Sequence, residues 1–206
     1  MTTLSPKATT TRTTLRRVEV LGAFGSGKTT LAERLAVGNV TLLAEHHEVN
    51  PFWGNAFANE RIGYLAYDLA FLLHHVDLAL RGDQTEPSDV VLCDWSFSSD
   101  LLWASMRLGN DFTQYQDVHS ILSHRLGPPI GWLYLRQPAE LIVDRLTRRA
   151  RAPEGELAKQ VATTIGGLDE LARSLPTERL ATVTDGTTAE ELLSYIADWT
   201  RLNVNG

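Results

Sequence analysis

Residues 22–29 have the types and spacing of a phosphate-binding loop. They read Gly-Ala-Phe-Gly-Ser-Gly-Lys-Thr, match the pattern G-x-x-x-x-G-K-[ST] at every fixed position, and follow a short run rich in valine and leucine at 18–21. In such a loop the backbone N–H groups face phosphate oxygens, the lysine reaches the β- and γ-phosphates, and the threonine hydroxyl holds Mg²⁺. An ordinary glycine turn is the alternative, which the predicted helix at 30–37 disfavours. We therefore expect a bound triphosphate, held by Gly22, Gly25, Ser26, Gly27, Lys28, Thr29 and Thr30.

Two carboxylates follow runs that are predicted to be strands beside this loop. Glu45 follows residues 40–44, and Asp94 follows the fully apolar residues 90–93. Side chains at the carboxyl ends of parallel strands project into the binding crevice, so both are candidates for chemistry. We assign Asp94 to Mg²⁺ together with Thr29, and Glu45 to the proton of an acceptor hydroxyl, a role typically worth about 10²–10⁴-fold in rate. The alternatives are a helix cap for Asp94 and an exposed loop position for Glu45.

Four arginines lie within seven residues, at positions 145, 148, 149 and 151. Arg145 and Arg149 are one helical turn apart and Arg151 follows, which suits a lid that closes on phosphates and cancels transition-state charge. We expect Arg145 and Arg149 to be catalytic together with Lys28, and Arg149 and Arg151 to contact the nucleotide. A solvated basic face is the alternative.

The remaining apolar pattern predicts alternating strands and helices. The predicted strands are 18–21, 40–44, 90–93, 130–135 and 180–183, and the predicted helices are 30–37, 59–81, 96–108, 114–126, 138–150, 156–175 and 188–201. This alternation indicates an α/β fold of the P-loop NTPase type, a doubly wound sheet of five parallel strands flanked by helices, with the arginine-rich lid. We expect one such P-loop domain over 16–206. Residues 1–15 are interpreted as a disordered tail rather than a transit peptide.

Composition limits the class of partner. The chain has 206 residues, a net charge of −6 and 43% hydrophobic residues. An acidic chain without a basic stripe argues against a nucleic-acid polymer or a membrane surface and favours a small molecule. No apolar stretch approaches the roughly 18 residues that a membrane span needs. Cys93, the one cysteine, lies in an apolar run, which predicts a buried inert thiol in a reducing, cytoplasmic compartment.

In order and spacing these motifs resemble the deoxynucleoside kinase family, particularly its bacterial deoxyadenosine/deoxyguanosine kinase-like branch. The family's Glu-Pro-Val motif and a following Asn-Pro-Phe run are similar to residues 45–47 and 50–52. Its Asp/Glu-Arg-Ser motif is similar to residues 94–96, and the next family Asp falls on Asp100. Its lid pattern of three arginines and a glutamate falls on Arg145, Arg149, Arg151 and Glu154.

The resemblance implies an ATP-dependent kinase, with Mg²⁺, that phosphorylates the 5′-hydroxyl of a deoxynucleoside in nucleotide salvage. It implies Glu45 as the base for that hydroxyl and Asp94 as the metal carboxylate. It also implies a homodimer formed through the long helices, and feedback inhibition by a triphosphate end product. The substrate-binding residues that it implies are Glu45, Phe52, Trp53, Tyr64, Asp68, Phe71, His75, Asp94, Asp100 and Glu154.

Three positions depart from the family pattern. Asp68 and His75 stand where the family's long helix carries a base-pairing Gln and, seven residues later, an Arg. Trp95 replaces the Arg beside the catalytic carboxylate, which removes a cation from the reaction site. An ionised Asp68 would accept a hydrogen bond from an exocyclic amine, which favours an amino-bearing base. The histidine pairs 46–47 and 74–75 are assigned pocket or surface roles rather than metal binding.

Two other functions stay open. A nucleoside monophosphate kinase would need additional cations for the acceptor's phosphate, but residues 45–80 contain only Arg61. A catalytically weak, regulatory nucleotide-binding protein is consistent with the loss of the Arg at position 95. The chain has no Asn-Lys-x-Asp and no Asp-x-x-Gly sequence, which argues against a GTPase.

Overall fold

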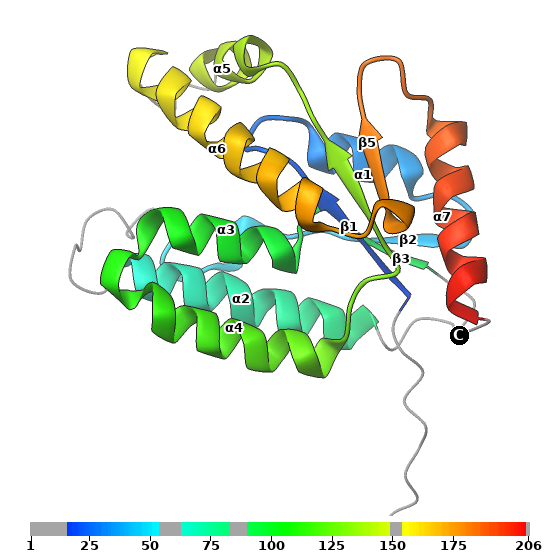
Figure 1. The fold of residues 1–206 in the computed structure, drawn as a ribbon, viewed down its shortest axis with the longest axis horizontal. Coiled ribbons are helices and arrows are strands. Elements are labelled where there is room, and N and C mark those ends of the chain that lie inside the picture. The colour runs from blue at the N-terminus through cyan, green and yellow to red at the C-terminus, as the bar shows by residue number, and fades with distance from the viewer. Residues whose placement is uncertain (1–15, 54–62, 83–89, 149–153, 205–206) are drawn as a thin grey trace, which may run out of the picture.

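A computed structural model describes residues 16–53, 63–82, 90–148 and 154–204, and these build one parallel sheet covered by helices (Figure 1). The sheet has five strands in the order β2-β3-β1-β4-β5. They are β1 (Arg17–Leu21), β2 (Val40–Leu43), β3 (Val90–Cys93), β4 (Gly131–Leu135) and β5 (Leu180–Val183). The predicted α/β class and the five predicted strands are confirmed. The chain crosses from one side of β1 to the other between β3 and β4, so the binding crevice is expected at the carboxyl ends of β1 and β3.

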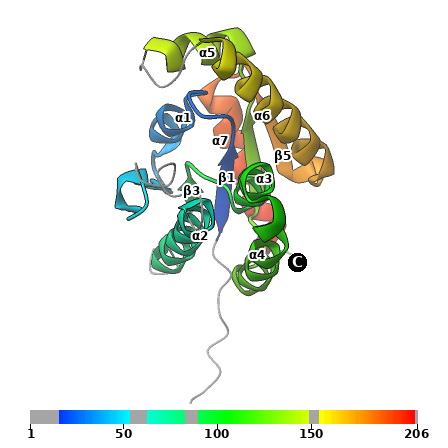
Figure 2. The same ribbon diagram turned by 90° about the vertical axis from the view of Figure 1, so that its left-hand side faces the viewer.

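One face of the sheet is covered by α1 (Lys28–Leu35) and α7 (Ala189–Val204). Because side chains alternate along a strand, Val18 and Val20 of β1 point to this face and pack with Leu35 of α1 and Ile196 of α7. In Figure 2, β1 lies between α1 on this face and α6 on the other.

The other face is covered by α2 (Gly63–Gly82), α3 (Phe97–Arg107), α4 (Phe112–Leu126), α5 (Ala139–Arg148) and α6 (Glu154–Ser174). Figure 1 shows α2, α3 and α4 side by side as one group and α5 with α6 as a second. Cys93 packs beneath the first group and is buried, as predicted, and burial raises the pKa of its thiol well above the ordinary value.

Helix boundaries differ from the predicted ones by a few residues. The first helix begins at Lys28 rather than at residue 30, because the last residues of the phosphate loop already form its first turn. The fourth begins at Phe112 rather than at 114, directly after the short helix η3 (Gly109–Asp111). Thr188 caps α7, as one of the two predicted caps: its hydroxyl accepts from the Glu191 N–H at 3.2 Å, and Glu191 Oε2 accepts from the Thr188 N–H at 2.8 Å.

A buried ion pair in β1 fixes the start of α3. Glu19 is fully buried between the sheet and α3, and its Oε1 accepts from Arg17 Nε at 2.7 Å. Its Oε2 accepts from the Ser96 hydroxyl at 2.7 Å and from the Phe97 N–H at 3.1 Å. Arg17 continues to the carbonyl of Gly127, at 3.0 Å. These contacts tie α3 to the central strand and therefore set where the rest of α3 lies.

Two further predictions concern the N-terminal tail and membrane-spanning helices. The tail predicted at 1–15 lies outside the described residues. Within the described ranges, no helix combines the length and the apolar character that crossing a bilayer requires.

Candidate active site

The phosphate loop at residues 22–27 joins β1 to α1. Gly25 and Gly27 have left-handed φ values of 77° and 102°, which favour glycine, and a Cβ on Gly25 would lie 3.0 Å from the side chain of Leu146. The ammonium of Lys28 donates to the carbonyls of Gly22 and Ala23, at 3.0 and 3.2 Å. Burial lowers the pKa of Lys28, and the carboxylates of Glu45 and Asp94 oppose that shift. The loop therefore presents a half-buried lysine at the carboxyl end of β1.

Thr29 and Asp94 lie in direct contact beside this cation. The Thr29 hydroxyl donates to Asp94 Oδ2 at 2.7 Å, and Asp94 Oδ1 accepts from the Glu45 N–H at 2.8 Å. Asp94 does not cap the following helix, because Ser96 occupies the N-cap position. A hydroxyl and a carboxylate are hard oxygen donors, and Mg²⁺ in nucleotide sites is typically held by one or two such groups plus phosphates. The pair therefore fits the predicted magnesium role.

Glu45 lies at the end of β2 and lines the same cavity as Lys28 and Thr29. Its carbonyl accepts from His74 Nε2 at 2.6 Å, and its Oε1 lies 3.2 Å from His75 Nε2. Burial alone would raise the pKa of Glu45, but the hydrogen bond and charge of His75 and the charge of Lys28 outweigh it and hold the pKa below the ordinary value. An ionised carboxylate therefore faces the phosphate loop, in the cavity and not on an exposed loop.

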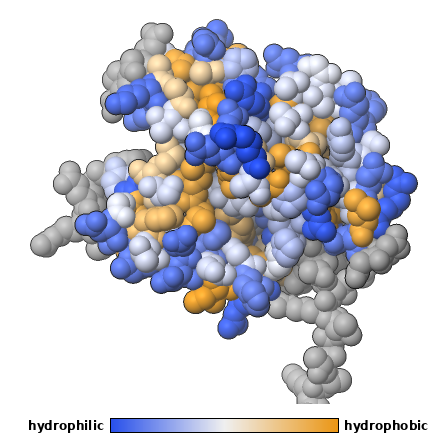
Figure 3. All heavy atoms as spheres, in the orientation of Figure 1, coloured by the Kyte–Doolittle hydropathy of each residue, from blue (hydrophilic) through white to orange (hydrophobic). Residues whose placement is uncertain are grey.

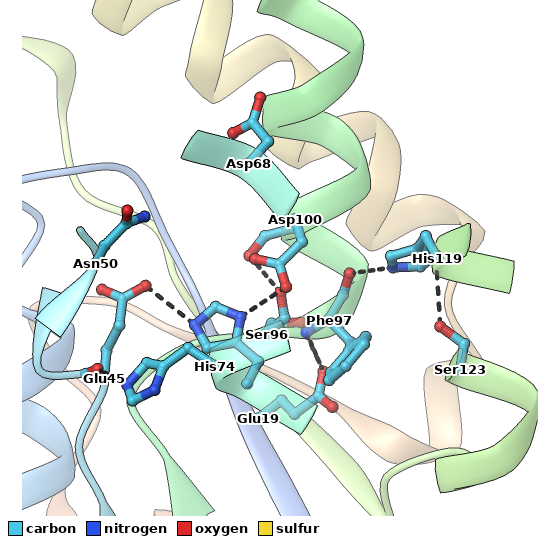
Figure 4. A network of polar contacts seen from close by, with 12 residues as sticks. Glu19, Glu45, Asn50, Asp68, His74, Ser96, Phe97, Asp100, His119 and Ser123 are labelled. Atoms are coloured by element: carbon cyan, nitrogen blue, oxygen red, sulfur yellow. Dashed lines mark hydrogen bonds and ion pairs between the residues drawn. The ribbon is translucent and has the colours of Figure 1, made fainter. Parts of the chain in front are cut away.

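His75 lies behind Glu45 and is not among the side chains that line the cavity. Its Nδ1 is 2.6 Å from Asp100 Oδ2, and its ring stacks on Trp95 with centroids 4.1 Å apart and planes 1° apart. Figure 4 shows Glu45 and Asp100 on opposite sides of one imidazole, each joined to it by a dashed line. Trp95 has no charged group to bond the carboxylate of Glu45. His75 on α2 bonds it instead.

The cavity has a volume of about 220 Å³ and largely aromatic walls beyond the phosphate loop. Trp53 and Tyr67 are stacked with centroids 6.1 Å apart, and Tyr67 meets Phe71 edge to face at 4.9 Å. Such walls suit a flat aromatic ligand. The other aromatic residues that line the cavity are Phe24, Trp95, Trp103 and Tyr115.

An ion pair between Asp68 and Arg107 lies at the aromatic end of this cavity. Arg107 Nε is 3.4 Å from Asp68 Oδ2, a second guanidinium nitrogen contacts Oδ1, and the guanidinium lies 5.4 Å from the centre of the Tyr67 ring. Burial raises the pKa of Asp68, and the charge of Arg107 opposes that shift. Arg107 was not predicted from the sequence. Its spacing was a usable signal, because it follows Asp100 by seven residues and so shares a face of α3 with it.

The predicted lid is described only in part. Arg145 Nη1 donates to the carbonyls of Ser26 and Gly25, at 2.9 and 3.3 Å, and so lies on the phosphate loop. Arg149 and Arg151 lie outside the described residues, and Glu154 is described only as the first residue of α6. The nucleotide and lid roles of these residues stay predictions.

The remaining predicted residues lie partly in this cavity and partly outside it. Phe52 is exposed and Tyr64 lines a neighbouring hollow of about 620 Å³ between α3 and α6, so neither lines the cavity that Lys28 and Glu45 share. Figure 3 shows hydrophobic surface gathered in this part of the molecule, where Trp103 and Met106 line the hollow. Ser26 is buried, and its hydroxyl has no partner within the described part of the chain. The cavity that Lys28 and Glu45 share is also lined by Thr30, Trp53, Phe71 and Asp100.

The histidines form no metal centre in the described part of the chain, where no group of three or more His, Cys, Asp or Glu residues could hold an ion. His46 and His47 lie near Glu48 on an exposed turn, η1 (His47–Val49). His74 and His75 both contact Glu45. His46 and His47 are therefore at the surface and His74 and His75 lie beside Glu45, whereas the prediction against metal binding stays a prediction.

Comparison with known proteins supports the fold. No protein-family model matches the chain, and no curated protein does. Three solved structures of deoxyadenosine kinase from M. mycoides are similar to it, one with bound dATP, one with bound dCTP, and one with the products dCMP and a flexible dCDP. Each is 16% identical, covers 91% of this chain and 99% of its own chain, with TM-scores of 0.67, 0.65 and 0.66 respectively. The chain therefore has the deoxyadenosine kinase-like P-loop fold.

Proposed function

We propose that the protein is a kinase that uses ATP to phosphorylate the 5′-hydroxyl of a deoxynucleoside. One observation carries this proposal: Glu45 lines the same cavity as Lys28 and Thr29, and Thr29 in turn contacts Asp94, so the candidate acceptor base and the candidate triphosphate site adjoin one space. The deoxynucleotides bound in the kinase structures of the same fold give it further support.

The residues divide the phosphoryl transfer between them. Glu45 would accept the proton of the 5′-hydroxyl as the new oxygen–phosphorus bond forms and the bond to the leaving ADP breaks. Lys28 would place positive charge on the transferring group. Thr29 and Asp94 would hold Mg²⁺, which, when bound, neutralises phosphate charge. Arg145 already lies on the loop carbonyls and would stiffen the loop around the phosphates.

The base of the substrate would enter the aromatic end of the cavity and meet Asp68 and Arg107. A carboxylate only accepts hydrogen bonds and a guanidinium only donates them. The pair therefore suits a base whose edge carries an exocyclic amine beside an acceptor, as adenine and cytosine do. Thymine has no such amine, so we infer that thymidine is the poorest of the four natural deoxynucleosides.

The monophosphate kinase alternative is less well supported. It would need free cations for the phosphate of its acceptor. Beyond the phosphate loop, the basic side chains among the described lining residues are His47 and Arg107, and Arg107 is already paired with Asp68. Arg61 lies outside the described residues.

The dimer and the cytoplasmic location are further inferences. Leu73 and Leu80 on α2 and Val118 and Ile121 on α4 are exposed, and these two helices pack against each other. We infer that a second copy covers this apolar face. Sedimentation should give a dimer, and Ile121→Glu should give a monomer; a monomer of the unchanged protein at all concentrations would contradict the inference. The cytoplasmic location stays a prediction.

Turnover on the four natural deoxynucleosides with ATP and Mg²⁺ tests the function. Lys28→Ala and Glu45→Gln should both abolish most turnover, whereas only Lys28→Ala should weaken ATP binding. Glu48→Gln is the matched control, because Glu48 lies on the exposed turn three residues from Glu45. Activity on deoxynucleoside monophosphates alone would replace this function with the alternative, and ATP binding without turnover on any acceptor would indicate a regulatory protein.

A further inference from the structure

We propose that His75 acts as a buried imidazolium that positions Glu45, holding one carboxylate oxygen so that the other faces the acceptor hydroxyl. This role rests on the proposed kinase function, because it concerns the base of the same reaction. It differs from the predicted role of His75 as a substrate contact, since the ring lies behind Glu45.

Both ring nitrogens of His75 face carboxylate oxygens. Nδ1 lies 2.6 Å from Asp100 Oδ2, and Nε2 lies 3.2 Å from Glu45 Oε1. An ionised carboxylate accepts but does not donate, and a neutral imidazole donates through one nitrogen only. Both contacts are hydrogen bonds to ionised carboxylates only when the ring carries two protons. Burial raises the pKa of Asp100, and the charge and hydrogen bond of His75 oppose that shift. With both carboxylates ionised, the geometry calls for a cation between two anions.

The ring is fixed by groups from three elements. Asp100 reaches it from α3, Glu45 from the end of β2, and Trp95, directly after the β3 end, covers its face at 4.1 Å. Only 1% of His75 is exposed. A buried charged side chain of this kind needs compensation on both sides, which the two carboxylates supply.

The two oxygens of Glu45 have different surroundings. Oε1 is held by His75, whereas Oε2 has no hydrogen-bond partner within the part of the chain that the structure describes. The carboxylate is therefore oriented before the substrate arrives. Orientation of a reacting group can contribute strongly to rate, and a displacement of about 1 Å can cost about 10²-fold.

Other titratable groups surround this chain of contacts. The charge of Lys28 on α1 lowers the pKa of Glu45, and the charge of His119 on α4 lowers the pKa of Asp100. The charge of Asp100 in turn raises the pKa of Asp68 on α2 and of Tyr115 on α4. Burial alone would lower the pKa of His75, but the charge of Asp100 and the hydrogen bonds to Asp100 and Glu45 raise it to about 9. Burial lowers the pKa of Lys28, so this lysine could also cause a loss of activity at alkaline pH.

Variants at position 75 separate these two causes. The turnover of the unchanged protein should fall above about pH 9, where His75 loses its charge. His75→Gln should lower kcat by about 10–100-fold, leave KM for ATP nearly unchanged, and remove this fall. His75→Arg should retain more activity and also lack that fall, because a guanidinium stays charged and can stack on Trp95. Asp100→Asn should move the fall to lower pH. His119→Gln is the matched control, since His119 is buried in the same layer but its hydrogen bonds to described residues go to the Phe97 carbonyl and Ser123, not to Glu45 or Asp100.

Two results of this series would overturn the role. An alkaline fall that survives in His75→Gln belongs to Lys28 or another group. A loss of kcat no larger than that of His119→Gln means that His75 has only a packing role.

A second measurement needs no turnover. In ¹⁵N-histidine-labelled protein, the resonances missing from His75→Gln should show both ring nitrogens protonated at pH 7.5 and titrating near pH 9, and Glu45→Gln should lower that midpoint. A neutral ring at pH 7.5 would overturn the inference even if the kinase is active. An imidazolium in a protein that phosphorylates none of the deoxynucleosides would overturn the proposed function and, with it, the catalytic purpose of this contact.

Discussion

Glu19 on β1 and Glu45 just after β2 each contact a basic side chain through Oε1, yet their second oxygens differ. Glu19 gives Oε1 to Arg17 and Oε2 to both the Ser96 hydroxyl and the Phe97 N–H. Glu45 gives Oε1 to His75, and in the described part of the chain its Oε2 has no partner. Figure 4 shows both carboxylates in one view, Glu19 beside Ser96 and Phe97 at the start of α3 and Glu45 apart from them, on the side of His74. A carboxylate with every oxygen paired fixes the fold, whereas one with an oxygen directed to a cavity is available for chemistry.

The largest effect is expected at Glu45. Glu45→Gln removes the proton acceptor and should lower kcat by about 10²–10⁴-fold, with little change in the free energy of unfolding. Steady-state kinetics and thermal unfolding on the same preparation measure both. A Glu45→Gln variant that loses stability but keeps its turnover would contradict this prediction, because it would give Glu45 a structural role like that of Glu19.

Glu19→Gln should show the opposite behaviour. It leaves Arg17 buried without a charged partner, a change that typically destabilises by about 3–5 kcal/mol. Denaturant unfolding measures the loss, with Glu33→Gln on the exposed surface of α1 as the control. The kcat of the molecules that remain folded should change little; a large fall in kcat without loss of stability would contradict a purely structural Glu19.

The Asp68–Arg107 pair is a third case, paired internally but facing the cavity. Asp68→Asn adds donors beside Arg107, so it should reduce the preference for amino-bearing deoxynucleosides over thymidine by about 10-fold, roughly the value of one recognition hydrogen bond. The ratio of kcat/KM values measures it. Asp77→Asn is the matched control, since Asp77 lies on the same helix and pairs with an arginine one turn away on the exposed surface. An unchanged ratio would assign the pair to folding alone.

Alkaline pH should weaken the contact between His75 and Glu45 but not the contact between Arg17 and Glu19, and the expected effect is smaller. Arg17 stays charged, whereas the pKa of His75 is raised from its ordinary 6.5 to about 9. A raised pKa in the folded state adds stability that is complete below about pH 6.5 and is lost as the pH rises through 9. The unfolding temperature of the unchanged protein should therefore fall by a few degrees between pH 7 and 10. His75→Arg should show less of that fall, and an equal fall in both would assign it to other groups.

The sequence predicted the parts of the site that depend on local spacing. The phosphate loop, the five strands and the carboxylates at the strand ends follow from patterns within a few residues, and the parallel sheet brings those ends together. Thr29 and Asp94 are therefore in contact, although 65 positions separate them.

Contacts between helices could not be predicted in the same way. The partner of Arg107 lies 39 positions away on another helix, and apolar spacing does not say which polar residues of two packed helices will meet. For the same reason His75 was assigned to the substrate, although the rotation of α2 places it behind Glu45. The burial of Glu19 was also missed, even though an arginine two residues earlier on the same face of the strand was a visible signal.

In the proposed kinase, helix α3 would set the distance between the two ends of a bound substrate. Its first turn is anchored through Ser96 and Phe97, and Asp100 and Arg107 both line the cavity, Asp100 on the side of His75 and Glu45 and Arg107 beside Asp68. Seven residues of α-helix span about 10 Å, so the separation between the two ends is built into one rigid rod. A molecule longer than that separation, such as an acceptor that already carries a phosphate, must displace one end. One residue inserted between positions 100 and 107 would turn Arg107 by about 100° away from the cavity, so that Asp100 and Arg107 would no longer line it together.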